Sequence, residues 1–297
     1  MTASLAMCIF RGAVHVRWDN TICENRARHR TRTSAARRIE SFDCEFDGDF
    51  RWRHLMRTET VRLGTARAQA GQKVWGHLRI AQGRKTSVLP VIVIHGARPG
   101  RHIVLMANQH GNEVNGVEAL RRFCVEVNPR RVRGTIFVIP SANPHAAIRG
   151  TACWFEGKDD KGGSYRSKYN MNWIWPGRRG GLLIERAVHE LWHQAILSPH
   201  AKASLVLDFH CASGAEASVA AEDGISQDLG VASGVRWINQ GRSVAISRQK
   251  PIEVSPLYCA CDKVGIPVLC IELAGQNKMT PSAIEAGVRI VRNVLKF

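Results

Sequence analysis

Short apolar runs alternate with segments of helical periodicity along most of the chain after residue 70. The runs at 73–81 and 86–95 are rich in β-branched residues and flank Gln82-Gly83-Arg84-Lys85, a sequence typical of a hairpin turn. Further strands are predicted at 103–106, 135–139, 204–210 and 266–273, and helices at 113–127, 182–197, 256–264 and 281–296. This alternation predicts an α/β fold, a mainly parallel mixed sheet flanked by helices on both faces.

Three segments lack such a pattern. Residues 1–70 show no sustained period and are predicted to be a poorly ordered, Arg-rich extension, followed by a catalytic domain at 71–297. Four acidic residues at 40–47 argue against a transit peptide, and Met56 is a candidate true start. The segment 211–245 shows only weak helical or strand periodicity. The segment 141–181 is polar, aromatic and rich in Gly, and we predict that it is a long functional loop.

A polar turn follows the apolar run at 103–106 and contains His110 and Glu113. Apolar residues then recur at helical spacing, so these two side chains lie between the carboxyl end of a strand and the first turn of a helix. In open α/β sheets this is where ligands bind. An imidazole and a carboxylate three residues apart can both reach one metal ion, and zinc accepts these ligands in catalytic sites with three protein ligands and a water.

The third ligand is predicted to be His210, which ends another apolar run. If the two strands are neighbours in one sheet, their carboxyl ends converge and His210 faces His110 and Glu113. Asp208 lies two residues earlier, on the same side of the strand, and could orient a ligand histidine. A structural histidine at a strand end is the alternative for His210.

A second zinc signature, HExxH, occurs at His189, Glu190 and His193. Apolar residues form one stripe of this predicted helix, and the two histidines lie with Glu185 and Arg186 on the opposite, polar side, which we expect to face solvent. The extended form HExxHxxGxxH also fails, because Ile196 and Pro199 stand where it needs Gly and His. We therefore favour the first site over a zincin peptidase.

Composition bears on where in the cell the protein is expected. The 297 residues contain no apolar stretch long enough for a transmembrane helix, which predicts no membrane association. Nine cysteines without a disulfide-like spacing predict a reduced, cytoplasmic protein. The formal charge is +17. Residues 1–70 hold 13 Arg, no Lys and 8 acidic residues, a net of +5 that leaves +12 for the rest. The excess is spread and has few interleaved aromatics, which predicts a solvated basic surface and no nucleic-acid partner.

Three motifs together resemble the succinylglutamate desuccinylase/aspartoacylase family of zinc carboxypeptidase-like hydrolases: the turn QHGNEVNG, the distant LDFH and the late strand VLCIELAG, which contains Glu272. The resemblance covers about residues 71–297. It implies a zinc carboxypeptidase-like fold, one zinc ion bound by His110, Glu113 and His210, and Glu272 as the general base. A carboxylate beside a zinc-activated water agrees with that role.

The chain departs from the family where the substrate is recognised. The family carries Asn-Pro followed, nine residues after the Asn, by a carbonyl-polarising Arg. Here Asn143 is present, but Ala152 stands at that place and Arg149 is the nearest basic residue. The later Asn-Arg pair appears as Asn172-Trp173. Because an Arg fork binds a carboxylate bidentately and Trp cannot, an apolar, aromatic or cationic group fits Trp173 and Trp175 better.

These observations predict a zinc-dependent hydrolase that cleaves an N-acyl amide, or an ester, in a small acylated molecule. Glu272 and Arg149 are the expected catalytic residues, and Asn143, Asn172 and Trp173 the expected substrate contacts. The alternatives are a metallocarboxypeptidase on the same site, the HExxH zincin peptidase, and a non-enzymatic basic binding protein.

Overall fold

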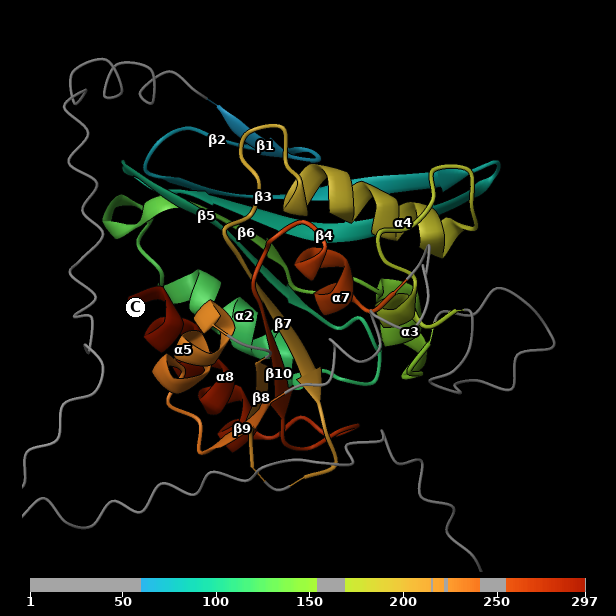
Figure 1. Cartoon of the computed structure of the whole chain (residues 1–297). Helices are drawn as coiled ribbons and strands as arrows, with labels where there is room; N and C mark the ends of the chain where they lie inside the picture. Colours follow the sequence, from blue (N-terminus) through green and yellow to red (C-terminus); the bar gives the residue numbers. More distant parts are fainter. Residues whose placement is uncertain (1–59, 154–168, 215, 222–223, 241–254, 297) are drawn as a thin grey trace, which may run out of the picture.

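An eight-stranded sheet runs through the centre of the computed structural model, which describes residues 60–153, 169–214, 216–221, 224–240 and 255–296 (Figure 1). Its strand order is β3-β4-β6-β5-β7-β10-β8-β9. The strands are β3 (Gln72–Gln82), β4 (Lys85–His95), β5 (Arg98–Ala107), β6 (Arg133–Ile139), β7 (Leu205–Cys211), β8 (Ser218–Ala221), β9 (Trp237–Gln240) and β10 (Val268–Leu273).

The sheet is mixed and mainly parallel, which confirms the predicted fold class. Parallel pairing joins β6, β5, β7 and β10 in the centre, and also β8 to β9. Antiparallel pairing adds the β3-β4 hairpin to β6 on one side and β8 to β10 on the other. The carboxyl ends of the three strands β5, β7 and β10 therefore meet at one edge, where ligands bind in such sheets.

Helices cover both faces of the sheet (Figure 1). One face packs against α4 (Leu183–Leu191), α7 (Leu257–Asp262) and the small hairpin of β1 (Val61–Leu63) and β2 (Ala66–Ala68). The other face packs against α2 (Asn115–Glu126), α5 (Gly224–Ala232) and α8 (Pro281–Lys296). Shorter elements are η1 (Pro129–Arg131), α3 (Pro144–Arg149), η2 (Met171–Trp173) and the π-helix η3 (Trp192–Ile196).

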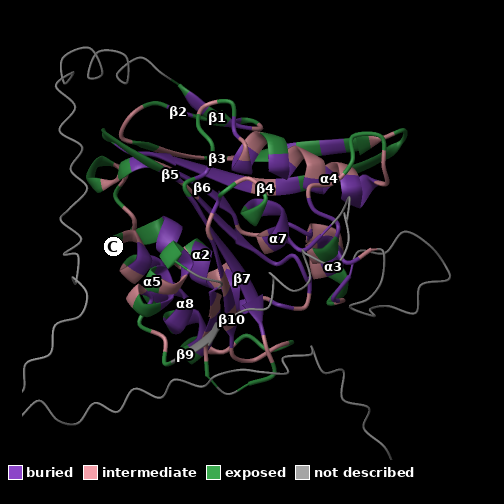
Figure 2. Ribbon diagram, viewed as in Figure 1, coloured by how far each residue is buried: buried purple, intermediate pink, exposed green. Residues whose placement is uncertain are grey.

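Successive side chains of the central strands point to opposite faces of the sheet, so the core has two parts. In β5, Val104 and Met106 face the α4 side, whereas Leu105 and Ala107 face the α2 side. All seven residues of β7 are buried, as expected of a parallel strand covered on both faces (Figure 2). Helix α2 approaches β7 at Gly116, where an added Cβ would lie 2.7 Å from Cβ of Phe209.

Several boundaries differ from the sequence-based prediction. Regular structure is already present between Thr60 and residue 71, where β1 and β2 place Val61, Leu63, Ala66 and Ala68 in the core. Strands of three residues are too short to show a period. Residues 1–59 lie outside the described residues, so the extension remains a prediction there. The predicted helix 182–197 is α-helical only to Leu191 and continues as η3, and 211–245 contains β8, α5 and β9.

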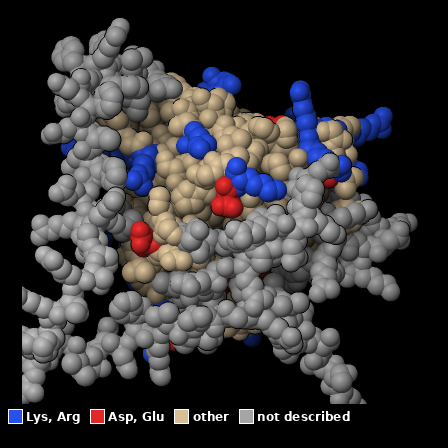
Figure 3. Space-filling model, in the orientation of Figure 1, with Lys and Arg blue, Asp and Glu red and all other residues tan. Residues whose placement is uncertain are grey.

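The basic side chains do not gather in one patch on the face shown in Figure 3. There, described Lys and Arg side chains stand at several separate places on a mostly uncharged surface. The six cysteines in the described part of the chain are free thiols. Within that part, no helix combines the length and hydropathy that a bilayer crossing requires.

Candidate metal centre

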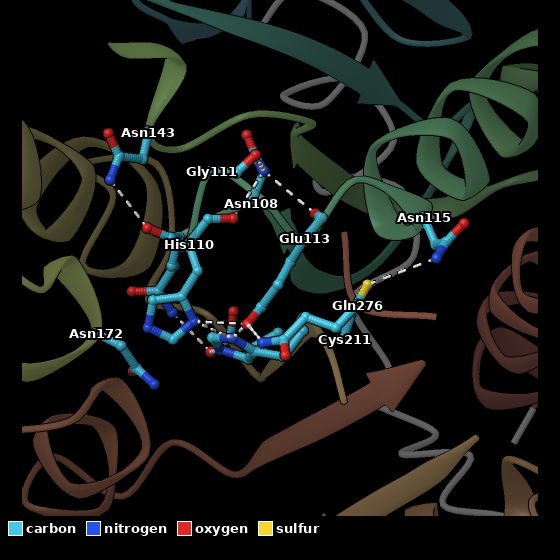
Figure 4. Close-up of polar contacts among 12 residues, drawn as sticks. Asn108, His110, Gly111, Glu113, Asn115, Asn143, Asn172, Cys211 and Gln276 are labelled. Atoms are coloured by element: carbon cyan, nitrogen blue, oxygen red, sulfur yellow. Dashed lines mark hydrogen bonds and ion pairs between the residues drawn. The ribbon is translucent and has the colours of Figure 1, made fainter. Parts of the chain in front are cut away.

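The turn after β5 is built around the side chain of Asn108. This residue has a positive φ of 63°, and its Nδ2 donates to the carbonyl oxygens of His110, Gly111 and Glu113 at 2.8, 3.1 and 3.2 Å. Gly111 has no room for a side chain, since a Cβ would lie 2.1 Å from the carbonyl carbon of Ala146. These contacts hold the turn in a conformation that directs His110 and Glu113 inward (Figure 4).

The three predicted ligands meet below this turn. Nδ1 of His110 lies 2.9 Å from Oε1 of Glu113, and Nδ1 of His210 lies 2.9 Å from Oε2 of the same carboxylate. The two Nδ1 atoms are 3.3 Å apart. His110, Glu113 and His210 are only 6%, 3% and 2% exposed. The three side chains form a group whose size suits one metal ion.

Electrostatics favour positive charge in this group. Burial alone would raise the pKa of Glu113, but the charges and hydrogen bonds of His110 and His210 lower it to about 2. Burial alone would lower the pKa of His210, but Asp208 and Glu113 raise it well above its ordinary value. A buried carboxylate held ionised between two imidazoles is stabilised by a cation, whether a proton or a metal ion.

A chain of hydrogen bonds leads from Trp175 to Nε2 of His210. The indole Nε1–H of Trp175, which can only donate, bonds to Oε1 of Gln109 at 2.7 Å. Nε2 of Gln109 must then donate to Oδ2 of Asp208, at 2.7 Å. Nε2 of His210 lies 3.0 Å from that same oxygen. When Nδ1 of His210 binds a metal ion, Nε2 therefore keeps its proton and donates to Asp208.

A second acceptor faces Nε2 of His110. Oδ1 of Asn170 accepts from the backbone N–H of Asn172 at 3.0 Å, which identifies this atom as the amide oxygen. It lies 3.1 Å from Nε2 of His110 and accepts from that nitrogen when Nδ1 binds a metal ion. The two Nδ1 atoms and the carboxylate of Glu113 thus converge on a single point. The donor set fits a divalent zinc-like ion, which takes imidazole nitrogen and carboxylate oxygen as ligands.

A second group of potential ligands, Asp208, His210 and Cys270, lies behind the first. It is a poorer metal site, because His210 would have to lose the Nε2 proton that it shares with Asp208. We interpret Asp208 instead as the residue that orients His210, as predicted from its place two residues earlier in β7.

Glu272 lies beside the three ligands. Its Cα pairs with that of His210 in the parallel register of β10 and β7, so both side chains leave the same face of the sheet. Burial raises the pKa of Glu272 to about 7; His210 opposes this shift and the nearby charge of Glu113 adds to it. A carboxyl group with a pKa near neutrality suits proton transfer in both directions.

The HExxH histidines do not form a comparable group. His189 and His193 lie one turn apart on α4 and η3 with ring centroids 4.3 Å apart, and His193 is exposed. Among the described residues, neither belongs to a group of three potential ligands. Glu185, which we expected on the same solvent-facing side, is instead buried. Its carboxylate accepts from the backbone N–H of Leu182 at 2.7 Å and pairs with Arg178 at 2.6 Å.

Residues 99–297 match the family model described as the succinylglutamate desuccinylase/aspartoacylase catalytic domain. The chain belongs to this family. Its fold is also that of solved structures, although none of the curated proteins searched matches the chain. Members of the family are hydrolases of the deacylase type, which agrees with a buried His-Glu-His group.

Three solved structures illustrate the shared fold. A succinylglutamate desuccinylase from Silicibacter sp. TM1040 has a TM-score of 0.62 and 19% identity, over 80% of this chain and 69% of that one. The ectoine utilization protein EutE (DoeB) from Ruegeria pomeroyi, in a product-bound structure, has a TM-score of 0.62 and 20% identity over the same shares. An aspartoacylase family protein from Mesorhizobium loti MAFF303099 has a TM-score of 0.52 and 20% identity, over 76% of this chain and 68% of that one.

The chain keeps the predicted Asn143 close to the turn that carries His110 and Glu113. The Oδ1 atom of this residue caps α3 by accepting from the backbone N–H of Ala146 at 3.2 Å, and its Nδ2 donates to the carbonyl of Gln109 at 3.0 Å. Ala152, at the family's Arg position, accepts from the backbone N–H of Gly111 at 3.2 Å. Arg149 is exposed at the end of α3, so its catalytic role stays a prediction.

The second family pair lies in η2. Asn172 accepts weakly from the backbone N–H of Leu257, at 3.4 Å, and Trp173 is 46% exposed. Trp175, which we also considered for substrate binding, is instead fully buried and bonded to Gln109. The pattern of alternating tryptophans did not distinguish these two positions.

Sequence reasoning missed four residues that support the site, namely Asn108, Gln109, Asn170 and Gln276. Gln276 lies after β10, and its Nε2 reaches Oε1 of Glu113 at 3.5 Å (Figure 4). Asn108 and Gln109 directly precede His110, so their positions in the turn were the available signal. Asn170 and Gln276 are distant in sequence and gave none.

Proposed function

We propose that this protein is a zinc-dependent hydrolase that uses one zinc ion per chain to deacylate a small N-acyl amide, or the corresponding ester. The observation that carries the proposal is the convergence of two Nδ1 atoms and a buried, ionised carboxylate, with each opposite Nε2 facing an oxygen acceptor. A divalent cation there would supply Lewis acidity, making water more acidic and a carbonyl more electrophilic.

Glu272 moves the proton in this proposal. Its carboxylate accepts a proton from the attacking water as the water oxygen bonds to the carbonyl carbon. The carboxyl group then donates that proton to the nitrogen as the C–N bond breaks, giving a carboxylic acid and an amine. A pKa of about 7 fits both steps, because neither protonation state is strongly disfavoured at neutral pH. The proposal assigns carbonyl polarisation to Arg149.

The substrate end remote from the scissile bond would lie against η2. Trp173 offers an exposed aromatic face there, beside the amide of Asn172. Such a face binds an apolar, aromatic or cationic group and gives no bidentate contact to a carboxylate. We therefore propose an N-acyl amine, or an N-acyl amino acid with an apolar or cationic side chain, as the substrate class.

A metallocarboxypeptidase on the same site is the second candidate, since the same ligands and base serve peptide hydrolysis. It differs in needing a group that binds the free C-terminal carboxylate of a peptide. The Trp at position 173 argues against it.

The test combines metal analysis with turnover. Purified protein should contain one zinc per chain, and His110→Ala and His210→Ala should each abolish stoichiometric binding, whereas the matched His189→Ala and His193→Ala should not. The same preparations would be assayed on N-acyl amines, N-acyl amino acids, simple esters and peptides. Loss of zinc only in the second pair would reverse the choice of site. Absence of zinc and of turnover would favour the basic binding protein.

A further inference from the structure

The segment from Asn170 to Trp175 reaches both histidines from outside the metal centre. Asn170 contacts His110 directly, whereas Trp175 reaches His210 through Gln109 and Asp208. We propose that Trp175 and Gln109 are positioning residues that hold His210 in its metal-binding tautomer. This inference rests on the proposed metal site and concerns residues that the family resemblance does not assign.

The directions of the hydrogen bonds in this chain follow from its first donor, the indole N–H of Trp175. An indole N–H cannot accept, so Trp175 sets which end of the Gln109 amide faces it. Gln109 is fully buried, and its other end has a single orientation, with the NH₂ group 2.7 Å from Asp208. Without the indole N–H, Oε1 of Gln109 would be buried without this donor, and the amide could tilt and weaken its bond to Asp208.

Asp208 is sensitive to such a change. It is 2% exposed, its Oδ2 atom receives both Gln109 and His210, and its Oδ1 atom has no hydrogen-bond partner within the described residues. Two donors on one oxygen are therefore what holds this carboxylate in place. Loss of the Gln109 donor would leave the buried carboxylate with His210 alone, which is costly and lets the carboxylate shift.

Packing is the competing explanation for Trp175. Its ring is fully buried in the core cluster on the α4 side, where Trp192 packs against it with ring centroids 6.3 Å apart. Trp192 is 5% exposed and lies in no hydrogen-bond chain leading to the histidines within the described residues. Comparison of Trp175→Phe with Trp192→Phe therefore separates hydrogen bonding from packing, because both variants lose the same indole group from the core.

The experiment compares Trp175→Phe, Trp192→Phe and Gln109→Met with the full wild-type chain. Zinc affinity is measured by competition with a chromophoric chelator. Solvent exchange of the His210 Nε2–H is followed by NMR in zinc-loaded protein labelled with ¹⁵N-histidine. Trp175→Phe should weaken zinc binding about tenfold, Gln109→Met about 10–100-fold, and both should speed exchange of that proton. Trp192→Phe should change affinity by no more than about twofold and leave the exchange as in wild type.

Equal zinc affinity and equal Nε2–H exchange in Trp175→Phe and Trp192→Phe would overturn the inference while leaving the metal site intact. If Trp175→Phe does not fold, Gln109→Met decides, and wild-type behaviour of that variant refutes the inference as well. Failure of the wild-type chain to bind zinc would instead remove the proposed function itself.

Discussion

Glu272→Gln should leave zinc bound but slow the reaction, because an amide keeps the shape of the carboxyl group and cannot accept the proton of water. Loss of a general base costs roughly 10²–10⁴ in kcat. The pH profile gives a second magnitude. With a pKa of about 7, Glu272 is about half ionised at pH 7 and about one-tenth ionised at pH 6. The charge of a bound metal ion favours the carboxylate and moves this titration to lower pH.

Wild-type kcat/KM should therefore rise with pH along a limb centred at or below about pH 7. Glu272→Gln should lose that limb together with its activity. The assay measures kcat/KM from about pH 5 to 8 on the best substrate from the screen, with zinc content determined in parallel. Glu185→Gln is the matched control, since it makes the same change in a carboxylate that is buried on α4 and paired with Arg178. Wild-type turnover by Glu272→Gln would refute the proposed proton transfer.

Three further outcomes are expected. Gly116→Ala should lower the free energy of unfolding by about 1–2 kcal/mol in urea titrations, because crowding against Phe209 at 2.7 Å exceeds the gain in helix propensity; a stabilised variant would contradict this packing. Zinc affinity should fall from pH 8 to pH 6, because Asp208 and Glu113 outweigh burial and raise the pKa of His210, so that protons compete with the metal; competition titrations showing the reverse trend would exclude this. Arg149→Ala should lower kcat by about 10²–10³ with zinc retained, and an unchanged kcat would assign carbonyl polarisation to another group.

The His-Glu-His group could be predicted from sequence because its histidines stand at or just after the carboxyl ends of recognisable strands. His110 and His210 stand where apolar runs give way to polar residues, and parallel neighbours bring such positions together. The HExxH helix could be set aside because its histidines oppose the apolar stripe. The orientation of Gln109 by Trp175 could not be predicted, since this contact joins residues 66 positions apart and depends on the path of the loop between them.

Strand limits were harder to predict where local signals conflict with the sheet. Pro99 and Gly100 mark a turn by composition, yet they lie within β5, at an irregularity in its pairing with β6 between Arg98 and His102. Such an irregularity tolerates a residue without an N–H. The limits of α8, by contrast, agree with the predicted 281–296, because its apolar stripe is long and regular.

The place of β4 has a practical consequence for anyone dividing this chain into fragments. The family match begins at residue 99, but β4 ends at His95 and hydrogen-bonds to β6 through residues 92–95. A fragment cut at the family boundary would leave the edge of β6 unpaired and uncover the apolar side of α4. Bare strand edges and large apolar patches promote aggregation. A soluble fragment must therefore retain the chain from about Thr60, where the first buried hairpin begins.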